Sequence, residues 1–476
     1  MSLPYDKVLQ DIADYVQGTV SLSHEAYDNA QLSLIDSLAC AFMALEKPEC
    51  TKLIGPLVPG TVVPGGVRVP GTPHVVDPVQ GAFSITALIR WLDYNDTWLA
   101  KEWAHPSDNF GAILAIADYV SQRRRRQGQP PYTVRDVLTA AIKAYEIQGV
   151  LALEVSLNRR GFDHVHYVKV ASAAVAAHLL GGDRETVLSA VSHAFIDGAA
   201  LRTYRHFPNT GPRKSWAAAD AASRGVRLAL LAYQGEVGYP TALTAPKWGF
   251  EAVVLGGEPV RLARPLGSYV MEHILYKVSY PAEFHGQTAV EAALRLHPVI
   301  KDRLEEIEKI VIETQESAVR IIDKPGPFRN PADRDHSLQY MTAVALLYGT
   351  LTYEHYEEPI ASDPRIPAII QRMEVRENPD FSRDYLDPEK RSIANAVQIF
   401  FRDGGHTERV LVEYPVGHRQ RRAEAIPLLR EKFAQAVRRT YPLKKSQQLY
   451  HLLAERSDWI DMPVDELMEL LAHPAI

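Results

Sequence analysis

The stretch "TVRDVLTAAIKAYEIQGVLAL", Thr133 to Leu153, repeats apolar residues three and four positions apart. That spacing matches the turn of an α-helix, so the stretch predicts a helix with an apolar face. Alanine also lies on several sides of this helix, which indicates burial among other helices. The stretch therefore predicts a fold built from packed helices.

The same periodicity recurs over most of the first half of the chain. Gly55–Pro73 is the exception, because its Pro-Gly pairs break helices and favour a loop or a small β excursion. We therefore predict a large all-helical domain over residues 1–268. The further segments with helical spacing are residues 6–17, 26–45, 78–94, 109–124, 166–182 and 184–201.

The pattern changes after about Val270. Residues 308–322, "EKIVIETQESAVRII", end in β-branched residues that suit a strand, and residues 392–415 contain two apolar runs joined by Asp-Gly-Gly, a hairpin signal. Short helices such as 338–349 lie between them. We predict a smaller α+β domain over residues 269–420, with helices of residues 421–476 rejoining the helical domain. The fold class is thus mainly α.

Composition excludes several classes of protein. The 476 residues carry a net charge of −6, which argues against nucleic acid as the main partner. The run "RRRRQGQPPY", Arg123 to Tyr132, has no aromatic interleaving, so we interpret it as a solvated loop between two helices. Cys40 and Cys50 are the only cysteines, too few for a disulfide framework or for an iron–sulfur cluster with three or four thiolates.

No targeting or membrane segment is evident. The first residues, "MSLPYDKVLQDIADYVQG", have early acidic residues and no apolar core of a signal peptide. No apolar run approaches the ~18–20 residues of a transmembrane helix. We expect a cytoplasmic protein, or a mitochondrial matrix protein if the source is eukaryotic, with no membrane partner.

Polar residues gather in "LDYNDTWLAKEWAHPSDN", Leu92 to Asn109. If the helix continues, Asp93 and Thr97 share one face, since they are four residues apart. His105 precedes a proline, which favours an extended conformation at a helix end. Ser107 or Asp108 can then cap the next helix. A site is one interpretation; capping or surface acids with a satisfied histidine are the other.

A second polar stretch, "LRTYRHFPNTGPRKSW", is strongly basic. Lys214 stands just ahead of an Ala-rich helix, whose positive N-terminus disfavours further cations unless an anion binds there. A carboxylate or phosphate ligand is the simplest compensation, and pairing with a buried acid such as Asp220 is the alternative. The basic residues concerned are Arg202, Arg205, His206, Arg213 and Lys214.

Other candidates are weaker by themselves. His285 precedes another Ala-rich helix, and "NPADRDHSLQY" supplies Arg334, His336 and Tyr340. The pair His164 and His166 has no second ligand pair at metal-binding spacing, so we expect no metal site. The sequence also lacks a G-x-S-x-G elbow, a P-loop and a dinucleotide-binding G-x-G-x-x-G, which disfavours hydrolases, kinases and dinucleotide oxidoreductases.

Taken together, these long motifs closely resemble the MmgE/PrpD family, and more narrowly its branch that dehydrates 2-methylcitrate. The resemblance extends over nearly the whole chain. The segments that carry it are "DPVQGAFSITALIRWLDYNDTWLAKEWAHPSDN", "LRTYRHFPNTGPRKSWAAADAASRGVRLAL", "GYPTALTAPKWGF", "SYPAEFHGQTAVEAA" and "NPADRDHSLQYM".

The resemblance implies a helical domain, a smaller α+β domain and a homodimer. It implies elimination of water from 2-methylcitrate to give 2-methyl-cis-aconitate in the methylcitrate cycle of propionate catabolism, with possible side activity on citrate and cis-aconitate. The reaction of this branch needs no iron–sulfur cluster, so we expect no cofactor. The alternatives are another activity of the family, such as cis-aconitate decarboxylation, and a catalytically silent helical scaffold.

The resemblance also assigns site residues. It implies catalytic roles for Asp93, Thr97, His105, His164, Lys214 and Tyr340. Arg202, Arg205, Arg213 and Arg334 are expected to bind the carboxylates of the substrate. In the expected mechanism His105 exchanges the substrate proton, and Asp93 orients His105 or holds the leaving hydroxyl. Tyr340 or His164 protonates the departing oxygen. The base and acid assignments can be exchanged.

Overall fold

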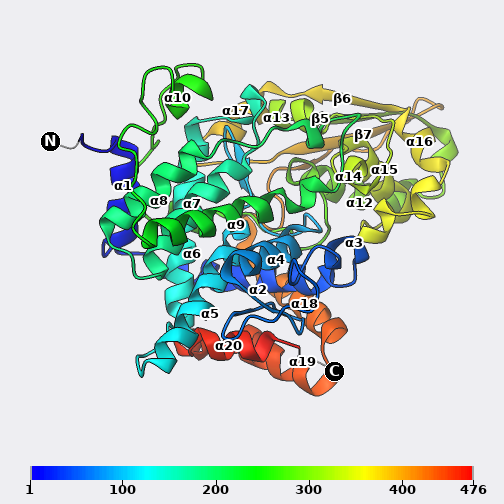
Figure 1. Cartoon of the computed structure of the whole chain (residues 1–476). Helices are drawn as coiled ribbons and strands as arrows, with labels where there is room; N and C mark the ends of the chain where they lie inside the picture. Colours follow the sequence, from blue (N-terminus) through cyan, green and yellow to red (C-terminus); the bar gives the residue numbers. More distant parts are fainter. Residues whose placement is uncertain (1–2, 474–476) are drawn as a thin grey trace. The chain divides into compact units, whose positions relative to one another are not determined.

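The computed structural model describes residues 3–473 and divides into two compact units (Figure 1). The first unit contains the residues up to Thr203, Ser215–Leu275 and the residues from Ile426 on. The second contains Tyr204–Lys214 and Tyr276–Ala425. The predicted all-helical domain, residues 1–268, includes residues 204–214. The structure groups them with the second unit, where Asn330 Nδ2 donates to the Thr210 carbonyl oxygen over 3.0 Å.

The first unit is built from helices. Its longest helices form where the apolar spacing predicts them, and the mainly α fold class is confirmed. They are α1 (Lys7–Gln17), α2 (His24–Ala44), α4 (Pro78–Arg90), α5 (Phe110–Arg126), α6 (Val134–Glu154), α7 (Val165–Leu179), α8 (Arg184–Ile196) and α9 (Arg213–Tyr233), whose first two residues belong to the second unit. The C-terminal segment adds α18 (Arg422–Thr440), of which the part from Ile426 belongs here, α19 (Leu443–Tyr450) and α20 (Val464–Leu471).

Helix α6 is buried over nearly its whole length, as the alanines on several of its sides predict. Thr133 caps its N-terminus by accepting a hydrogen bond from the Asp136 backbone N–H. The Asp136 carboxylate in turn accepts one from the Thr133 backbone N–H. This capping box satisfies two of the orphan donors at the helix start. Helix α6 packs against α2 and α7, so the remaining helices are arranged around it.

The arginine run was predicted to be a loop, and this was wrong. Arg123–Arg126 form the last turn of α5. Arginine is a good helix former, and cations are favourable at a helix C-terminus. Arg125 also forms ion pairs with Asp465 and Glu466 of α20, so the run joins α5 to the C-terminal helices.

Short elements complete the first unit. Strands β1 (Val67–Arg68) and β2 (Val75–Val76) form a small antiparallel pair next to the Pro-Gly loop, in line with the predicted β excursion. Strands β3 (Trp98–Leu99) and β4 (Trp103–Ala104) form a second pair, which leads directly into His105. The single-turn helices are α3 (Pro48–Thr51), α10 (Phe250–Val253) and α11 (Tyr269–Glu272).

The second unit contains a four-stranded sheet in the order β6-β5-β7-β8. Strand β5 pairs in parallel with β6, whereas β5 with β7 and β7 with β8 are antiparallel, which confirms the hairpin predicted around Asp-Gly-Gly. The strands are β5 (Ile307–Thr314), β6 (Met373–Glu377), β7 (Asn395–Phe401) and β8 (Val410–Val412).

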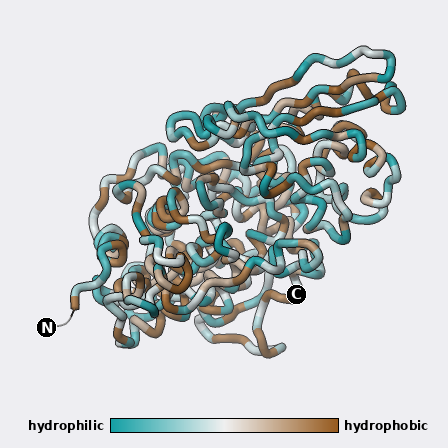
Figure 2. Tube along the Cα trace, turned by 90° about the horizontal axis from the view of Figure 1, so that it is seen from above, coloured by the Kyte–Doolittle hydropathy of each residue, from teal (hydrophilic) through white to brown (hydrophobic). Residues whose placement is uncertain are grey.

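One face of this sheet is covered by α12 and α15, which together with β5 and β7 form the apolar core of the unit (Figure 1). Apolar and hydrophilic stretches alternate along the chain trace in Figure 2, as expected for elements with one buried face. The helices are α12 (Gln287–Ile300), α13 (Glu316–Ile322), α14 (Pro331–Arg334), α15 (Leu338–Tyr348), α16 (Arg365–Ile370) and α17 (Pro379–Leu386).

The end of residues 308–322 is helical, not a strand as predicted. Ala318 and Ile322 are both buried and lie four residues apart, so together they form one helical face. The strand ends earlier, at Thr314. Among residues 3–473, no helix combines the length and the apolarity needed to cross a membrane.

The close contact between α4 and α5 depends on Gly111. A Cβ at this position would lie 2.0 Å from Thr86 Oγ1 and 2.7 Å from the Thr86 backbone N, so α4 itself would have to move. We therefore expect Gly111→Ala to lower the free energy of unfolding by about 1–3 kcal/mol in urea denaturation. The control is Gly267→Ala, whose added Cβ meets no heavy atom within 4 Å. Equal stability of the two variants would contradict this account.

Candidate active site

The turn after α4 carries the first candidate residue, Asp93. The predicted continuation of the helix to Thr97 is wrong, because α4 ends at Arg90 and Asp93 adopts φ +50°. Aspartate is among the few residues that adopt the left-handed region at moderate cost. The buried Arg90 guanidinium pairs with the Asp93 carboxylate, and the Asp93 N–H donates to the Arg90 carbonyl oxygen over 3.1 Å. The turn thus presents a buried carboxylate that already has a cationic partner.

His105 follows strand β4 with φ −126° and ψ 84°, before the short helix η1 (Pro106–Asn109). Its Nδ1 lies 2.7 Å from the backbone carbonyl oxygen of Asp96. A carbonyl oxygen only accepts hydrogen bonds, so Nδ1 must carry the hydrogen. In the neutral ring the lone pair is therefore on Nε2, which lies 3.7 Å from Asp93 Oδ1. This tautomer is the one in which Nε2 can accept a proton.

The Asp96 side chain holds the other end of the same loop. Its Oδ1 accepts from the Ser107 N–H at 3.0 Å and from Ser107 Oγ at 2.6 Å, and its Oδ2 accepts from the Tyr145 hydroxyl at 2.6 Å. Burial raises the pKa of Asp96 to about 6, although these hydrogen bonds oppose the shift. Ser107 or Asp108 was predicted to cap the next helix, but α5 has no side-chain cap. Ser107 binds Asp96 instead, which fixes the backbone on both sides of His105.

His164 and Thr97 complete this group. The rings of His105 and His164 have centroids 5.9 Å apart, and both side chains are almost fully buried. His164 Nδ1 lies 3.2 Å from Asp163 Oδ1, and Thr97 Oγ1 lies 3.5 Å from His105 Nδ1. We call Asp93, Thr97, His105 and His164 the histidine cluster. All four belong to the first unit, and they come from two separate segments of the chain.

Arg202, predicted to bind substrate, has a buried acidic neighbour. Glu102 lies between β3 and β4, is fully buried, and accepts from the Asn158 N–H at 2.7 Å and from Asn158 Nδ2 at 2.8 Å. Burial raises the pKa of Glu102 to about 7, while the nearby Arg202 guanidinium and Asn158 oppose the shift. The Arg202 guanidinium also lies 5.9 Å from the centre of the Trp103 ring. Arg202 therefore compensates a buried acid of the hairpin that precedes His105.

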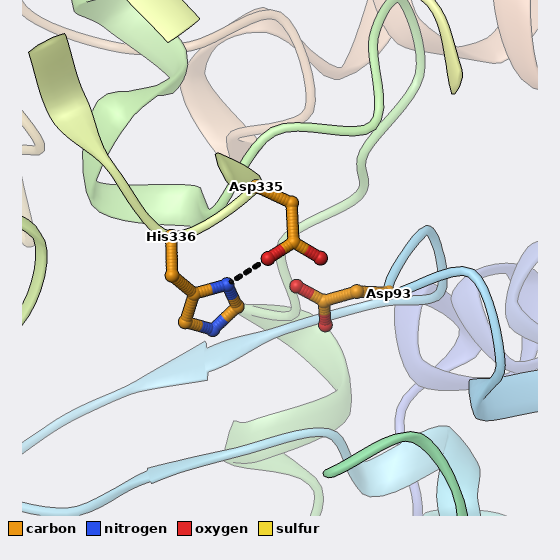
Figure 3. A group of neighbouring side chains, drawn as sticks. All are labelled: Asp93, Asp335 and His336. Atoms are coloured by element: carbon orange, nitrogen blue, oxygen red, sulfur yellow. Dashed lines mark hydrogen bonds and ion pairs between the residues drawn. The ribbon is translucent and has the colours of Figure 1, made fainter. Parts of the chain in front are cut away.

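Lys214 belongs to the second unit, in the first turn of α9. Its Nζ lies 2.6 Å from Asp335 Oδ1, 3.0 Å from His336 Nδ1 and 3.2 Å from the Ala332 carbonyl oxygen. Asp335 and His336 are themselves hydrogen-bonded at 2.8 Å (Figure 3). The alternative to an anionic ligand, pairing with an acid, thus occurs, but with the half-buried Asp335 and not with Asp220. We call Lys214, Asp335 and His336 the lysine cluster.

Tyr340 and Arg334, two predicted site residues of the second unit, form hydrogen bonds within that unit. The Tyr340 hydroxyl donates to the His355 carbonyl oxygen over 2.6 Å within the apolar core, and burial raises its pKa to about 12. Arg334 donates to the Tyr356 carbonyl oxygen and to Glu358. Both side chains hold the fold of the second unit together.

Arg205 and Arg213 lie near each other because both contact Tyr204. Their guanidinium carbons are 5.5 Å and 5.4 Å from the centre of that ring. Arg205 is largely buried at the end of the short helix η3 (Thr203–Arg205), and Arg213 begins α9. Both guanidinium groups therefore lie beside one aromatic ring.

A buried hydrogen-bonded series in the second unit was not predicted as a site. His285 Nδ1 lies 2.8 Å from Glu283 Oε1, and His285 Nε2 lies 3.1 Å from the Tyr385 hydroxyl. Burial would raise the pKa of Glu283, but His285, His336 and Lys277 outweigh it and hold the pKa below its usual value. The motif "AEFHG" marked His285, but nothing local identified Tyr385, which lies 100 residues away.

Neither unit by itself holds three His, Cys, Asp or Glu ligand atoms close enough together for a metal ion, over the residues that the structure describes.

We expect the protonation of the buried Glu102 carboxyl to make the free energy of unfolding depend on pH. In the folded protein Glu102, with its pKa of about 7, keeps its proton up to that pH, whereas in the unfolded chain it loses the proton near its usual pKa of 4.5. Between these values the folded state binds more protons, so the free energy of unfolding falls as the pH rises. From pH 4.5 to 7, the wild type should lose on the order of 2–3 kcal/mol more than Glu102→Gln in urea titrations. Glu49→Gln, at an exposed position, should follow the wild type; parallel curves for all three proteins would contradict the burial effect.

Comparison with known proteins shows the family to which the chain belongs. Residues 10–263 match the MmgE/PrpD N-terminal domain, and residues 280–456 match the MmgE/PrpD C-terminal domain. The chain is 55% identical over 469 residues to "2-methylcitrate dehydratase" of Escherichia coli (strain K12), which covers 98% of this chain and 97% of that protein. It is 55% identical over 470 residues to "2-methylcitrate dehydratase" of Cupriavidus necator, with coverage of 98% and 97%.

A eukaryotic relative is similar over the same length. The chain is 51% identical over 470 residues to "2-methylcitrate dehydratase, mitochondrial" of Yarrowia lipolytica, covering 98% of this chain and 90% of that protein. Two family models in sequence order and relatives that match from end to end lead to one conclusion. The chain belongs to the MmgE/PrpD family.

Proposed function

We propose that this protein is a hydro-lyase that eliminates water from 2-methylcitrate to give 2-methyl-cis-aconitate. The full-length identity of 55% with proteins named 2-methylcitrate dehydratase carries the proposal. The histidine cluster supplies the chemistry that such an elimination needs, namely a base with a defined tautomer next to a second titratable ring.

The proton is removed by His105. Dehydration takes a weakly acidic C–H beside a carboxylate and expels hydroxide from the neighbouring carbon. Because Nδ1 donates to the Asp96 carbonyl oxygen, Nε2 is the nitrogen that accepts the substrate proton. The Asp93 carboxylate, 3.7 Å from Nε2, stabilises the imidazolium that results.

His164 protonates the leaving hydroxyl. Of the two candidates from the sequence, Tyr340 has its hydroxyl engaged with the His355 carbonyl oxygen in the core of the second unit. His164 instead has its ring next to His105, with Asp163 to support a positive charge on Nδ1. The two histidines then act as a base and acid pair, which is a common division of roles in elimination.

The substrate carboxylates bind to cations of the second unit. Lys214 has three donors, and a substrate carboxylate can replace one of its present contacts with Asp335, His336 or the Ala332 carbonyl oxygen. Arg205 and Arg213 offer planar guanidinium groups for bidentate binding of a second carboxylate. Negative charge that develops next to a carboxylate in the transition state is thereby stabilised.

The assembly and location follow from the family resemblance and the relatives. We propose a homodimer that acts on a small tricarboxylate, in the cytoplasm of a bacterial source or in the mitochondrial matrix of a eukaryotic one. The Yarrowia lipolytica relative, which carries the word mitochondrial in its name, supports the second case.

Substrate choice is tested by ultraviolet absorbance of the conjugated alkene. Chelator-treated protein should form the alkene from 2-methylcitrate, and more slowly from citrate, which lacks one methyl group. A missing methyl group changes the rate constant kcat/KM by roughly 10–200-fold. Release of carbon dioxide from cis-aconitate without any alkene from 2-methylcitrate would indicate a decarboxylase and overturn the proposal.

The roles of the clusters are tested by single substitutions. We expect His105→Gln to lower kcat on the order of 10²–10⁴-fold, as loss of a general base does.

Lys214→Ala should lower kcat/KM by about 10–100-fold, since it removes a charge-assisted hydrogen bond. The matched controls are His451→Gln and Lys309→Ala, whose side chains are 64% and 43% exposed. Near-wild-type turnover of both cluster variants would refute the assignment.

A further inference from the structure

A buried lysine from the C-terminal segment contacts the turn that carries Asp93. Lys432 of α18 is almost fully buried, and its Nζ donates to the backbone carbonyl oxygen of Tyr94 over 2.7 Å. The same Nζ lies 3.6 Å from the centre of the Tyr94 ring. Lys432 thus contacts both the backbone and the side chain of Tyr94, the residue that follows Asp93, although Lys432 lies 338 residues from Tyr94 in sequence.

The lysine is itself held by Asp36. Asp36 lies in the buried middle of α2, and its Oδ1 is 2.7 Å from Lys432 Nζ. The two side chains are 1% and 4% exposed, so solvent screens this ion pair little. All three partners belong to the first unit. Two long helices, α2 and α18, are therefore tied to one turn through a single ammonium group.

The turn needs such support because its backbone is in an uncommon conformation. Asp93 has φ +50°, and a non-glycine residue in this region persists only where the surroundings determine it. Within the turn, the Asp93 N–H bonds to the Arg90 carbonyl oxygen. The Tyr94 carbonyl, one peptide further on, obtains its donor from Lys432. Rotation of that peptide would move both Asp93 and Asp96, whose carbonyl holds His105.

We propose that Lys432, held by Asp36, is a positioning residue that fixes the turn of Asp93 and thereby the distance between the Asp93 carboxylate and His105. This inference rests on the proposed dehydration, in which that carboxylate supports His105. Stability alone is a poor reason for the pair, because a buried ion pair is often no more stabilising than well-packed apolar residues. The carbonyl contact is what apolar residues cannot replace.

The test is the double variant Asp36→Leu/Lys432→Met, which removes both charges together and leaves neither one buried alone. We expect it to fold with a melting temperature near that of the wild type. Its kcat for 2-methylcitrate should fall on the order of 100-fold, as displacement of a catalytic group by about 1 Å does, with KM nearly unchanged. Lys432→Arg, which keeps a cation for the carbonyl, should restore much of the activity.

Lys143→Met is the matched control. Lys143 is a buried lysine of the same unit that likewise donates to two carbonyl oxygens, those of Val16 and Gly18 at 2.8 Å and 3.0 Å. Its loss should lower the melting temperature but leave kcat and the pH profile of kcat unchanged. Wild-type kcat in the double variant, or an equal loss of kcat in Lys143→Met, would overturn the positioning role.

A second readout does not depend on turnover. In protein labelled with ¹³C-histidine, the ring signal of His105, assigned by its absence in His105→Gln, reports the surroundings of the ring directly. It should shift in the double variant and not in Lys143→Met. An unchanged signal overturns the inference even if the wild type proves inactive on 2-methylcitrate, whereas a shifted signal in an inactive protein leaves the positioning role standing and refutes only the proposed function.

Discussion

The hydrogen bond from His105 Nδ1 to the Asp96 carbonyl oxygen is the contact on which the histidine cluster depends. It selects the tautomer of the ring, because a carbonyl can only accept. It also fixes which edge of the ring faces Asp93.

That contact is only as rigid as the loop that supplies the carbonyl. Asp96 uses its backbone for His105 and its side chain for Ser107, so one residue determines the chain before and after the imidazole. Tyr145 of the largely buried helix α6 binds the remaining carboxylate oxygen and joins the loop to that helix. The loop is thus part of the helical core, which is why a segment with little regular structure can hold a ring in place.

The sequence predicted the regular elements better than the contacts of the site. Apolar spacing located α6 and α7, and Asp-Gly-Gly located the hairpin of β7 and β8. The spacing failed at Asp93, because periodicity does not show that Arg90 pairs with it and lets the chain turn. Partners distant in sequence were beyond reach as well: Asp335 lies 121 residues from Lys214. Such choices depend on tertiary packing, which a local pattern does not contain.

Buried acids of the two units have pKa values shifted in opposite directions, and this difference has a chemical reason. In the first unit, burial raises the pKa values of acids such as Asp96 and Glu102. In the second unit, Glu283 has a lowered pKa beside His285, His336 and Lys277. A region rich in cations stabilises an incoming carboxylate but suppresses the basicity of a histidine. A base is therefore better placed among acids and backbone acceptors, and a carboxylate is better bound among cations.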